Sequence, residues 1–566
     1  MKKLGMLVLF ITSLTLEAQN LDSLYNMFVN IRSGSSSAIL QNRTESGMIE
    51  NDKCAFGLVN RIIANYDQFS PEQKKVLQKI LARPETDTSI VSPSGLFRIH
   101  FNKSDYPDYV PNDIRTNLTS EQLSNYKKIY LDSLAIAADS SFNYEVNILN
   151  YPAPPSDGYE GGDGKYDIYI QALTSNTYGY TQGETPITDS TFTSYMVIDN
   201  DFANYYTTRI YAARVTIAHE FHHAIQMGNY ILRFSDQFYY ELTSVSMEEF
   251  VFDNVNDYYN DLRTFMKYPQ RSFAANDGYD LAIWNLFLRS EFDVNIIKRT
   301  WEFMGEHDRA LISVADAIAE RGSSFKNEFA KFGLWLYFTG PRALPGKYFE
   351  EAANYPLVTP LISMEFSASD ISKSVSVSSS PLSTNILFFQ STNGSETDTL
   401  VSIISNTDLT NGVNNIYSTT GFTYTLSQQS GQDFRFIIDD YYSKIESDGD
   451  FLLSESNVFK NFPVNNGQVI STEIDYAYPQ PFRYSRDRFI YFPVSLSQQG
   501  TVDLSIYSAD MRRVYSGQTT VLALDKAVVQ WNCMNNSGGK LNSGVYFYVI
   551  KSGDIVKKGK FVILND

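Results

Sequence analysis

The segment His219-Glu220-Phe221-His222-His223 constrains the fold of this chain more than any other feature of its sequence. The chain has only 5 histidines, and this segment holds three of them. On an α-helix, four steps of about 100° place His219 and His223 roughly 40° apart on one face, where both imidazoles can hold one metal ion. The apolar residues that flank the segment predict a buried helix over 207–227. The sequence therefore predicts a domain built around a metal-binding helix.

This pair of histidines suits zinc. A catalytic zinc ion needs about three protein ligands and one open position, and neutral imidazole is a suitable ligand. Glu220 lies one step round the helix from His219, where it can act as general base on the water that zinc activates. His222 points about 60° away from His219, so we expect a structural role for it. The alternative is a core helix with chance histidines, which would bury imidazole and carboxylate groups without partners, a rare situation.

The third zinc ligand should come from a following helix, predicted over 237–265. Glu241, Ser244 and Glu248 share one face of this helix, and the small Ser244 lets it approach the first helix closely. Both glutamates are candidate ligands, although a solvated helix face is the competing interpretation for Glu248. A tetrahedral oxyanion needs a hydrogen-bond donor besides the metal, and Tyr279 is our candidate for that role.

Changes in residue pattern divide the chain, which at 566 residues is too long for one hydrophobic core. Apolar residues at helical spacing predict a helical N-terminal segment or pro-segment over 19–91. Strands followed by helices predict an α+β domain over 92–357, in which the strand at 195–198 is placed to be the sheet edge along which a peptide substrate could lie. Short Ser/Thr/Val-rich runs between Asn-Gly and Asp-Gly turns predict a β-sandwich over 358–465 and a second β module over 466–566. The predicted fold class is multidomain, an α+β domain followed by two all-β domains.

Residues 1–18 have the pattern of a secretory signal peptide. Lys2 and Lys3 precede an apolar stretch over 4–16, and Ala18 precedes a plausible cleavage point. The apolar stretch is shorter than the ~20 residues that cross a bilayer, and no other segment approaches that length. We therefore expect a protein without a transmembrane segment that is secreted, either extracellular or attached to the cell surface.

The net charge of -18 argues against two classes of partner, because it repels the phosphates of nucleic acids and of anionic lipids. The chain has 2 cysteines, Cys54 and Cys533, in different predicted domains, so a disulfide framework is excluded. Cys54 could cap the zinc ion in a latent form if residues 19–90 are a pro-segment. A lone buried cysteine is the interpretation that the sequence favours.

An acidic, glycine-rich loop could bind calcium, which prefers oxygen ligands. Asp157, Asp163 and Asp167 would supply carboxylates, together with Glu160. Loops of this composition are also typical of simple turns. The predicted cofactors are therefore Zn²⁺ and, at this loop, Ca²⁺.

The stretch from Ser92 to about Tyr337 resembles a family of secreted bacterial metallopeptidases of the gluzincin type. The matching motifs, in chain order, are Ser92–His100, Asp157-Gly158 with Gly161-Gly162, Tyr166–Tyr169, Tyr178–Thr181, Asp199–Asp201 and the metal helix. The resemblance implies a zincin fold and hydrolysis of peptide bonds, but no particular substrate. In gluzincins the third ligand is a Glu that begins the second helix, within a Trp-x-x-Glu-Gly-x-Ala type motif, and Glu241 matches it. Leu242 and Ser244 depart from the usual Gly and Ala, so Glu248 stays the alternative.

The C-terminal module resembles an immunoglobulin-like sorting domain of type IX secretion. The matching segments are Tyr478–Phe482, Val502–Tyr507, Trp531, Ser543–Tyr548 and Lys557–Ile563. Gln480 stands where such domains usually have Asn. The resemblance implies export across the outer membrane by the type IX secretion machinery, often with removal of the domain and anchoring to the surface. A plain accessory β-sandwich is the competing interpretation.

Three functions fit these features. The leading one is a zinc endopeptidase that acts on protein or peptide substrates. The second is a catalytically inactive zincin fold that serves as a surface adhesin or glycan-binding protein, with its many tyrosines stacking on sugars; the intact zinc motif argues against it. The third is an aminopeptidase, in which Glu248 or Glu249 would hold the amino terminus of the substrate.

Overall fold

The computed structural model describes most of the chain. The described residues are 21–32, 53–103, 118–173, 177–202, 205–367, 370–391, 398–414, 418–428, 441–460, 477, 479, 481–485, 489–494, 501–509, 511–523, 527–552 and 555–565. The predicted signal peptide over 1–18 lies outside them, as do residues 478 and 480 of the C-terminal motif. Among the described helices, none combines the length and the apolarity needed to cross a bilayer.

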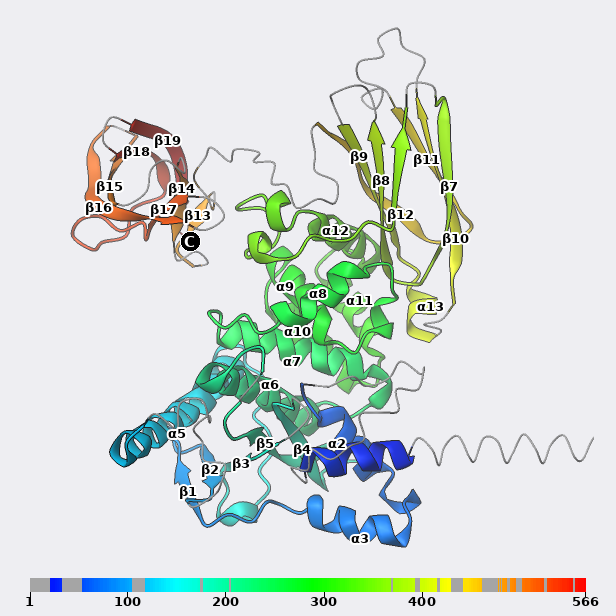
Figure 1. Cartoon of the computed structure of the whole chain (residues 1–566), viewed down its shortest axis with the longest axis vertical. Helices are drawn as coiled ribbons and strands as arrows, with labels where there is room; N and C mark the ends of the chain where they lie inside the picture. Colours follow the sequence, from blue (N-terminus) through cyan, green and yellow to red (C-terminus); the bar gives the residue numbers. More distant parts are fainter. Residues whose placement is uncertain are drawn as a thin grey trace, which may run out of the picture.

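A five-stranded mixed sheet with the order β1-β2-β3-β5-β4 occupies the lower part of the molecule in Figure 1. The strands are β1 (Thr88–Val91), β2 (Phe97–Phe101), β3 (Tyr166–Gln171), β4 (Gly179–Pro186) and β5 (Phe192–Asp199). β2, β3 and β5 are parallel, whereas β1 and β4 are antiparallel to their neighbours. β1 falls within the range predicted for the N-terminal segment, so the sheet begins before residue 92.

The edge of this sheet is β4, and the prediction that 195–198 forms the edge is wrong. β5 is an internal strand, because it pairs with β3 on one side and with β4 on the other. The sequence of β4 is polar and contains two glycines, so the alternation that marks a strand is weak there. An edge strand leaves a row of backbone N–H and C=O groups without partners in its own sheet.

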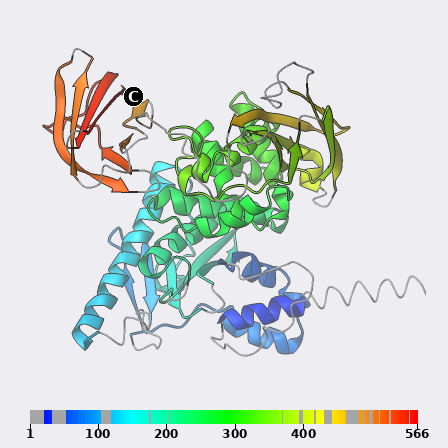
Figure 2. The ribbon, with the colours of Figure 1, turned by 45° about the horizontal axis from the view of Figure 1, so that its top comes forward.

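Two sets of helices cover the two faces of the sheet. They are α2 (Phe56–Ala64), α3 (Pro71–Ile80), α5 (Ser120–Phe142) and α6 (Arg209–Asn229), together with the helical residues 21–32. Met196 and Ile198 share a core with α5 and α6, whereas Tyr195 and Val197 share one with the N-terminal helices. Successive residues of a strand point to opposite faces, so β5 contributes to both cores. In Figure 2 the N-terminal helices, in blue, lie well apart from α5, in cyan.

After the sheet the chain is helical as far as residue 337. The helices are α7 (Gln237–Val251), α8 (Tyr259–Lys267), α9 (Ala282–Glu291), α10 (Asn295–Gly305), α11 (Ala310–Glu320) and α12 (Phe325–Tyr337). The single helix predicted over 237–265 is instead the pair α7 and α8. The intervening residues include Asp253, Asn254, Asn256 and Asp257, whose side chains favour turns over helix.

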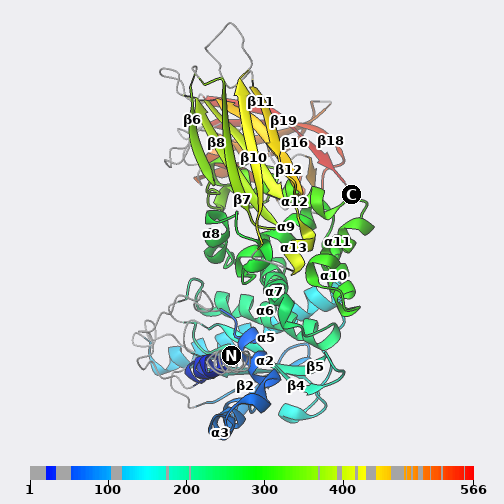
Figure 3. The same cartoon turned by 90° about the vertical axis from the view of Figure 1, so that its right-hand side faces the viewer.

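Two β domains follow. The first has a four-stranded sheet, β12-β9-β8-β6, and a three-stranded sheet, β11-β10-β7. Its strands are β6 (Ile362–Phe366), β7 (Ser372–Ser379), β8 (Ser383–Ser391), β9 (Asp398–Asn406), β10 (Thr420–Gln428), β11 (Tyr441–Glu446) and β12 (Phe451–Lys460), with the short helix α13 (Leu409–Asn414) between β9 and β10. Strands β9 and β12 contact α12, and Figure 3 shows this domain beside the helical part.

The second β domain has a separate hydrophobic core, which includes Phe492, Trp531 and Tyr548. Its strands form one seven-stranded sheet in the order β13-β19-β18-β15-β16-β17-β14. They are β13 (Phe482–Arg483), β14 (Ile490–Pro493), β15 (Thr501–Ser508), β16 (Arg513–Ala523), β17 (Ala527–Trp531), β18 (Gly544–Ser552) and β19 (Ile555–Leu564). The molecule is therefore multidomain, with helices and several β-sheets.

Trp284 on α9 lies at the centre of the helical core, and its replacement tests that core. Its ring centroid is 5.1 Å from that of Phe332 and 5.5 Å from that of Phe287, and the side chain is 1% exposed. Trp284→Ala should lower the free energy of unfolding of this core by about 3–5 kcal/mol, because it leaves a cavity. Calorimetry should show the transition of the C-terminal domain unchanged, since its core is separate.

The control for this variant is Ile129→Ala on α5, whose side chain is 56% exposed. It should change the free energy of unfolding by less than about 0.5 kcal/mol. Equal destabilisation by both variants would contradict the position assigned to Trp284.

Candidate metal centre

Two packed helices bring three predicted zinc ligands together. α6 carries His219 and His223, and α7 carries Glu241; all three side chains are no more than 1% exposed. His219 Nε2 lies 3.1 Å from His223 Nε2 and 3.2 Å from Glu241 Oε2, and His223 Nε2 lies 3.4 Å from the same oxygen. Ligand atoms bound tetrahedrally to one zinc ion are about 3.3–3.5 Å apart. The three atoms therefore have the spacing that a zinc ion requires.

The chemistry of these donors also fits a cation. Glu241 Oε1 is buried and has no hydrogen-bond partner among the described residues. Burial alone would raise the pKa of Glu241, but the imidazoles of His223 and His219 outweigh it and lower that pKa to about 2. The two imidazoles thus compensate the buried carboxylate of Glu241 while they carry charge, and a cation would have to do so if they were neutral metal ligands.

Glu248, the alternative ligand, lies on the other side of His219. Its Oε1 is 2.8 Å from His219 Nδ1, the ring nitrogen that faces away from Glu241. Lys53 Nζ donates to both Glu248 oxygens, at 2.7 and 2.6 Å, and to Asp257 Oδ2 at 2.5 Å. A carboxylate on the second nitrogen of a metal-binding histidine fixes the orientation of the ring and strengthens it as a ligand. Glu248 therefore faces the outer nitrogen of His219, as such an orienting carboxylate does, while Glu241 faces the nitrogen within the cluster.

Three residues hold His223, the second predicted ligand on α6. His223 Nδ1 is 2.7 Å from Gln226 Oε1 and 3.2 Å from the Ser244 hydroxyl. The Phe56 ring stacks on its imidazole at a centroid distance of 4.0 Å and an angle of 5°. Ser244 was predicted to permit close approach of the two helices, and it also contacts this histidine.

His222 points away from the other two histidines. Its Nδ1 lies 2.8 Å from Glu145 Oε2, in the turn of π-helix, η2 (Asn143–Ile148), that ends α5. Burial lowers the pKa of His222 and raises that of Glu145, which favours the neutral form of both groups, and one hydrogen bond joins them. This contact joins α6 to the end of α5, as a structural role for His222 requires.

Glu220 faces the edge strand. The Thr181 hydroxyl on β4 lies 2.9 Å from Glu220 Oε2 and 2.7 Å from the Glu220 backbone carbonyl. Burial raises the pKa of Glu220, and the charges of His219 and His223 act in the opposite direction. β4 comes this close because of Gly179, where a Cβ would lie 2.8 Å from a backbone oxygen of β5 and 3.3 Å from Glu220 Cγ. Thr181 was not predicted, since nothing local marks it.

Tyr279 lies beside the ligands. Its ring is stacked on His219 at a centroid distance of 6.3 Å, and its hydroxyl donates to the backbone carbonyl of Cys54 at 3.0 Å. Gly278, at φ +109°, lets the chain before Tyr279 lie this close to α7. A Cβ at residue 278 would lie 2.1 Å from the Phe238 carbonyl oxygen. Tyr279 is therefore brought to the site, where its hydroxyl can reach a peptide carbonyl.

Cys54 completes the cluster. One ligand atom from each of Cys54, His219, His223 and Glu241 forms a group in which all atoms lie within 4.8 Å of one another. Burial raises the pKa of the Cys54 thiol, and so do the nearby carboxylates Glu220 and Glu241. The sequence gave two interpretations of Cys54, and the position of its sulfur among the predicted ligand atoms favours the zinc-capping one.

The acidic loop is occupied by protein cations. Asp157 and Asp167 form ion pairs with Arg83, and Asp163 forms one with Arg98. These guanidinium groups supply the positive charge that a calcium ion would bring. The calcium prediction is thus disfavoured, and the loop is held by an ion-pair network.

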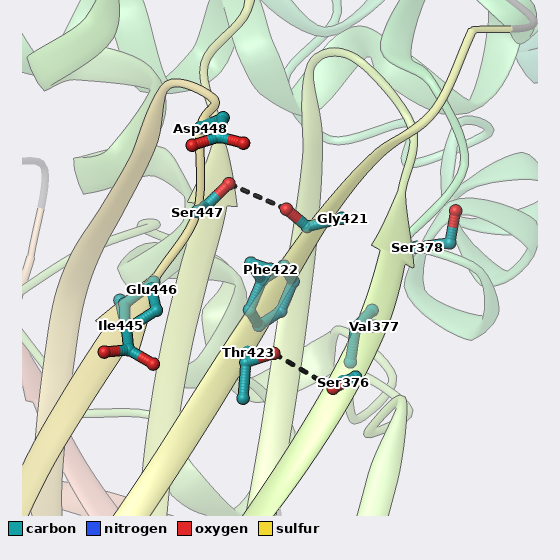
Figure 4. Close-up of a pocket in the computed structure, with 10 residues that line it drawn as sticks. All are labelled: Ser376, Val377, Ser378, Gly421, Phe422, Thr423, Ile445, Glu446, Ser447 and Asp448. Carbon is teal, nitrogen blue, oxygen red and sulfur yellow. Dashed lines mark hydrogen bonds between the residues drawn. The ribbon is translucent and has the colours of Figure 1, made fainter.

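A surface pocket of about 810 Å³ lies elsewhere, on the three-stranded sheet of the first β domain (Figure 4). Its polar groups bond one another: Ser376 with Thr423 at 2.9 Å, and Ser447 with the Gly421 carbonyl at 2.7 Å. Its one aromatic side chain, Phe422, is buried. The aromatic ring that lines this pocket is therefore not exposed for stacking on a sugar.

No family model matches the chain, and no curated protein matches it. Among solved structures, one match is PorZ, described as an essential bacterial surface component of the type-IX secretion system of Porphyromonas gingivalis. It is 12% identical over 30% of this chain and 29% of that one, with a TM-score of 0.14. Another is dimeric latent PorU from Porphyromonas gingivalis, 13% identical over 32% of this chain and 20% of that one, with a TM-score of 0.13. The chain spans less than a third of either protein, and TM-scores this low carry no argument about function.

The separate roles of the two glutamates can be tested by zinc affinity. Glu241→Gln removes a ligand charge and should abolish stoichiometric zinc binding in competition with a chelator. Glu248→Gln should retain zinc with an affinity reduced roughly 10–100-fold, the usual effect of losing a carboxylate that orients a histidine. The exposed Glu306→Gln is the control and should bind zinc as the wild type does. If Glu248→Gln loses zinc and Glu241→Gln keeps it, the two roles are reversed.

Proposed function

We propose that this chain is a secreted zinc metallopeptidase with a zincin-like catalytic domain, in which His219, His223 and Glu241 bind the metal. The observation that carries the proposal is the spacing of their ligand atoms, 3.1 to 3.4 Å, on two buried helices. A zinc ion held there supplies a Lewis acid that lowers the pKa of water to near neutrality.

Glu220 is the general base of the proposed reaction. It takes a proton from the attacking water and passes it to the nitrogen of the leaving amine. The burial that raises its pKa favours both steps, because a carboxylate of ordinary acidity would be a weaker base and would hold the proton less well. Thr181 orients it by hydrogen bonding, and the ligand histidines on the same helix keep it close to the metal position.

Tyr279 is the proposed donor to the developing oxyanion. Its hydroxyl already donates to a backbone carbonyl, that of Cys54, within this cluster. A substrate carbonyl in the same place would accept the same hydrogen bond, which strengthens as negative charge develops on the oxygen.

The edge strand β4 supports binding of an extended peptide and therefore endopeptidase action. It pairs with the backbone next to Cys54, where Ala55 N donates to the Gly179 carbonyl at 3.0 Å. A substrate strand can add to the same edge. The aminopeptidase alternative would need Glu248 or Glu249 for the amino terminus, but Glu248 is engaged by His219 and Lys53. Burial and the nearby charge of Glu351 raise the pKa of Glu249, which suits a protonated carboxyl better than an ammonium partner.

We also propose that the protein is exported from the cell, and this proposal has its own evidence. It rests on the signal-peptide pattern and on the resemblance of the C-terminal module to a type IX sorting domain. The separate core of that domain is compatible with its removal after export. The protein would then act outside the cell or at its surface.

The test of the proposed function is cleavage of a mixed peptide library by the wild type and by Glu220→Gln, followed by mass spectrometry. Both proteins are assayed before and after limited proteolysis, because residues near Cys54 cover the ligands. Glu220→Gln should retain zinc and lose activity by roughly 10²–10⁴-fold, the scale of general base catalysis. The control Glu306→Gln should match the wild type. Equal cleavage by Glu220→Gln and the wild type, or a wild type that binds no zinc, would refute the proposal.

A further inference from the structure

The N-terminal segment lies along the sheet edge beside the ligands. Cys54 forms a parallel β-bridge with Gly179, the first residue of β4. Tyr178 N donates to the Lys53 carbonyl at 2.7 Å, and Ala55 N donates to the Gly179 carbonyl at 3.0 Å. Residues 53–55 therefore use the backbone groups with which a substrate strand would have to pair.

The side chain of Asn60 continues this pairing further along the strand. Its Nδ2 donates to the Thr181 carbonyl at 3.0 Å, and its Oδ1 accepts from Gly183 N at 3.0 Å. Asn60 is 2% exposed, so the amide replaces the peptide group of a neighbouring strand inside the protein. From Tyr178 to Gly183, the N-terminal segment thus takes up hydrogen-bonding groups along the sheet edge.

Cys54 carries the segment into the metal centre. Its sulfur lies in the same group of ligand atoms as those of His219, His223 and Glu241, and the residue is 3% exposed. Three protein ligands leave a zinc ion one open position, whereas four of this type give a closed site. The Glu241 oxygen without a hydrogen-bond partner is an independent sign that a cation belongs among these atoms.

We propose that Cys54 is the fourth zinc ligand, and that residues 53–60 hold the enzyme latent by filling both the open coordination position and the substrate edge. This inference rests on the zinc site proposed above. The chain's own thiol and backbone would regulate the enzyme by filling the positions that otherwise bind water and peptide.

Buried contacts anchor the segment on both sides of the thiol. On one side the Lys53 ammonium pairs with Glu248 and Asp257, whose side chains are 1% and 3% exposed. Burial opposes the charge on Lys53, but Asp257 and Glu248 outweigh it and raise its pKa well above the ordinary value. On the other side Phe56 stacks on His223. The thiol is thus fixed between two contacts that both reach groups next to the ligands.

A purely structural cysteine would leave no trace in the spectrum of the metal, so cobalt distinguishes the two roles. The full-length chain is loaded with Co²⁺ in place of zinc. The wild type should show thiolate-to-cobalt charge-transfer absorption in the near ultraviolet, and Cys54→Ser should bind cobalt without it. Cys533→Ser is the matched control, because Cys533 is buried in the separate C-terminal core, and it should keep the wild-type spectrum.

Activity supplies the second measurement. Cys54→Ser and Cys54→Ala should cleave the peptide library roughly tenfold faster or more than the untreated wild type, because a larger fraction of molecules has an open site. Adding Glu220→Gln to either variant should abolish the gain. Lys53→Met keeps the thiol but loses its anchor, and it should weaken the charge-transfer band and raise activity even if the cysteine variants fold poorly.

The outcomes separate the two proposals. A wild type that binds no cobalt refutes the zinc site and the proposed function with it. Cobalt bound with the same spectrum in the wild type and in Cys54→Ser refutes the role of Cys54 and leaves the zinc site standing. Unchanged activity in correctly folded Cys54→Ser likewise refutes latency through this residue.

Discussion

The packing of α6 against α7 is the contact on which the rest of the site depends. It places two imidazoles and an ionised carboxylate around one point in the interior. Burying an ionised group without a partner costs several kcal/mol, so a cation at this point would let the helices pack closely. Ser244 permits the approach and at the same time contacts His223. Close packing of α6 on α7 and metal binding would therefore both require this approach of the two helices.

Charge compensation continues outward from the ligands. Glu248 lies between His219 and Lys53, and Lys53 lies between Glu248 and Asp257. Removing one member of a buried ion pair costs about 3–5 kcal/mol, because the other charge is left uncompensated. Withdrawal of Lys53 would leave two such carboxylates. The N-terminal segment is thus coupled electrostatically to a histidine ligand, in addition to any bond from its thiol to the metal.

The sequence predicted the part of the site that is encoded locally. The spacing of His219, Glu220 and His223 on one helix follows from helical periodicity alone, and their positions in the structure agree with it. Glu241 was preferred through the gluzincin resemblance, since periodicity could not separate it from Glu248. Only the packed helices show which nitrogen of His219 each glutamate faces.

Hydrophobic periodicity in the sequence does not predict contacts between distant parts of the chain. The pairing of Cys54 with Gly179 joins residues far apart in sequence, and neither neighbourhood has a pattern that indicates the other. β4 was missed as the sheet edge because it is polar and contains glycine, and the apolar β5 was taken as the edge because it lies upstream of the metal helix. An apolar strand is more typical of the middle of a sheet, where both faces are covered. The arginines opposite the acidic loop were missed for the same reason as the pairing of Cys54 with Gly179.

The two faces of the sheet limit how the latent site can open. Val59 and Ile62 of α2 belong to the core on the face opposite the metal, whereas Cys54 and Phe56 belong to the core on the metal side. Removing the whole N-terminal segment would expose that opposite face, including Tyr195, to water. Unpairing residues 53–55 from β4 would uncover the ligands and the edge beside Gly179, while Asn60 on α2 would still cover Thr181 and Gly183. The smallest movement that opens the metal centre is therefore local to the strip beside Cys54, and the remaining N-terminal helices serve as a permanent cover of the sheet.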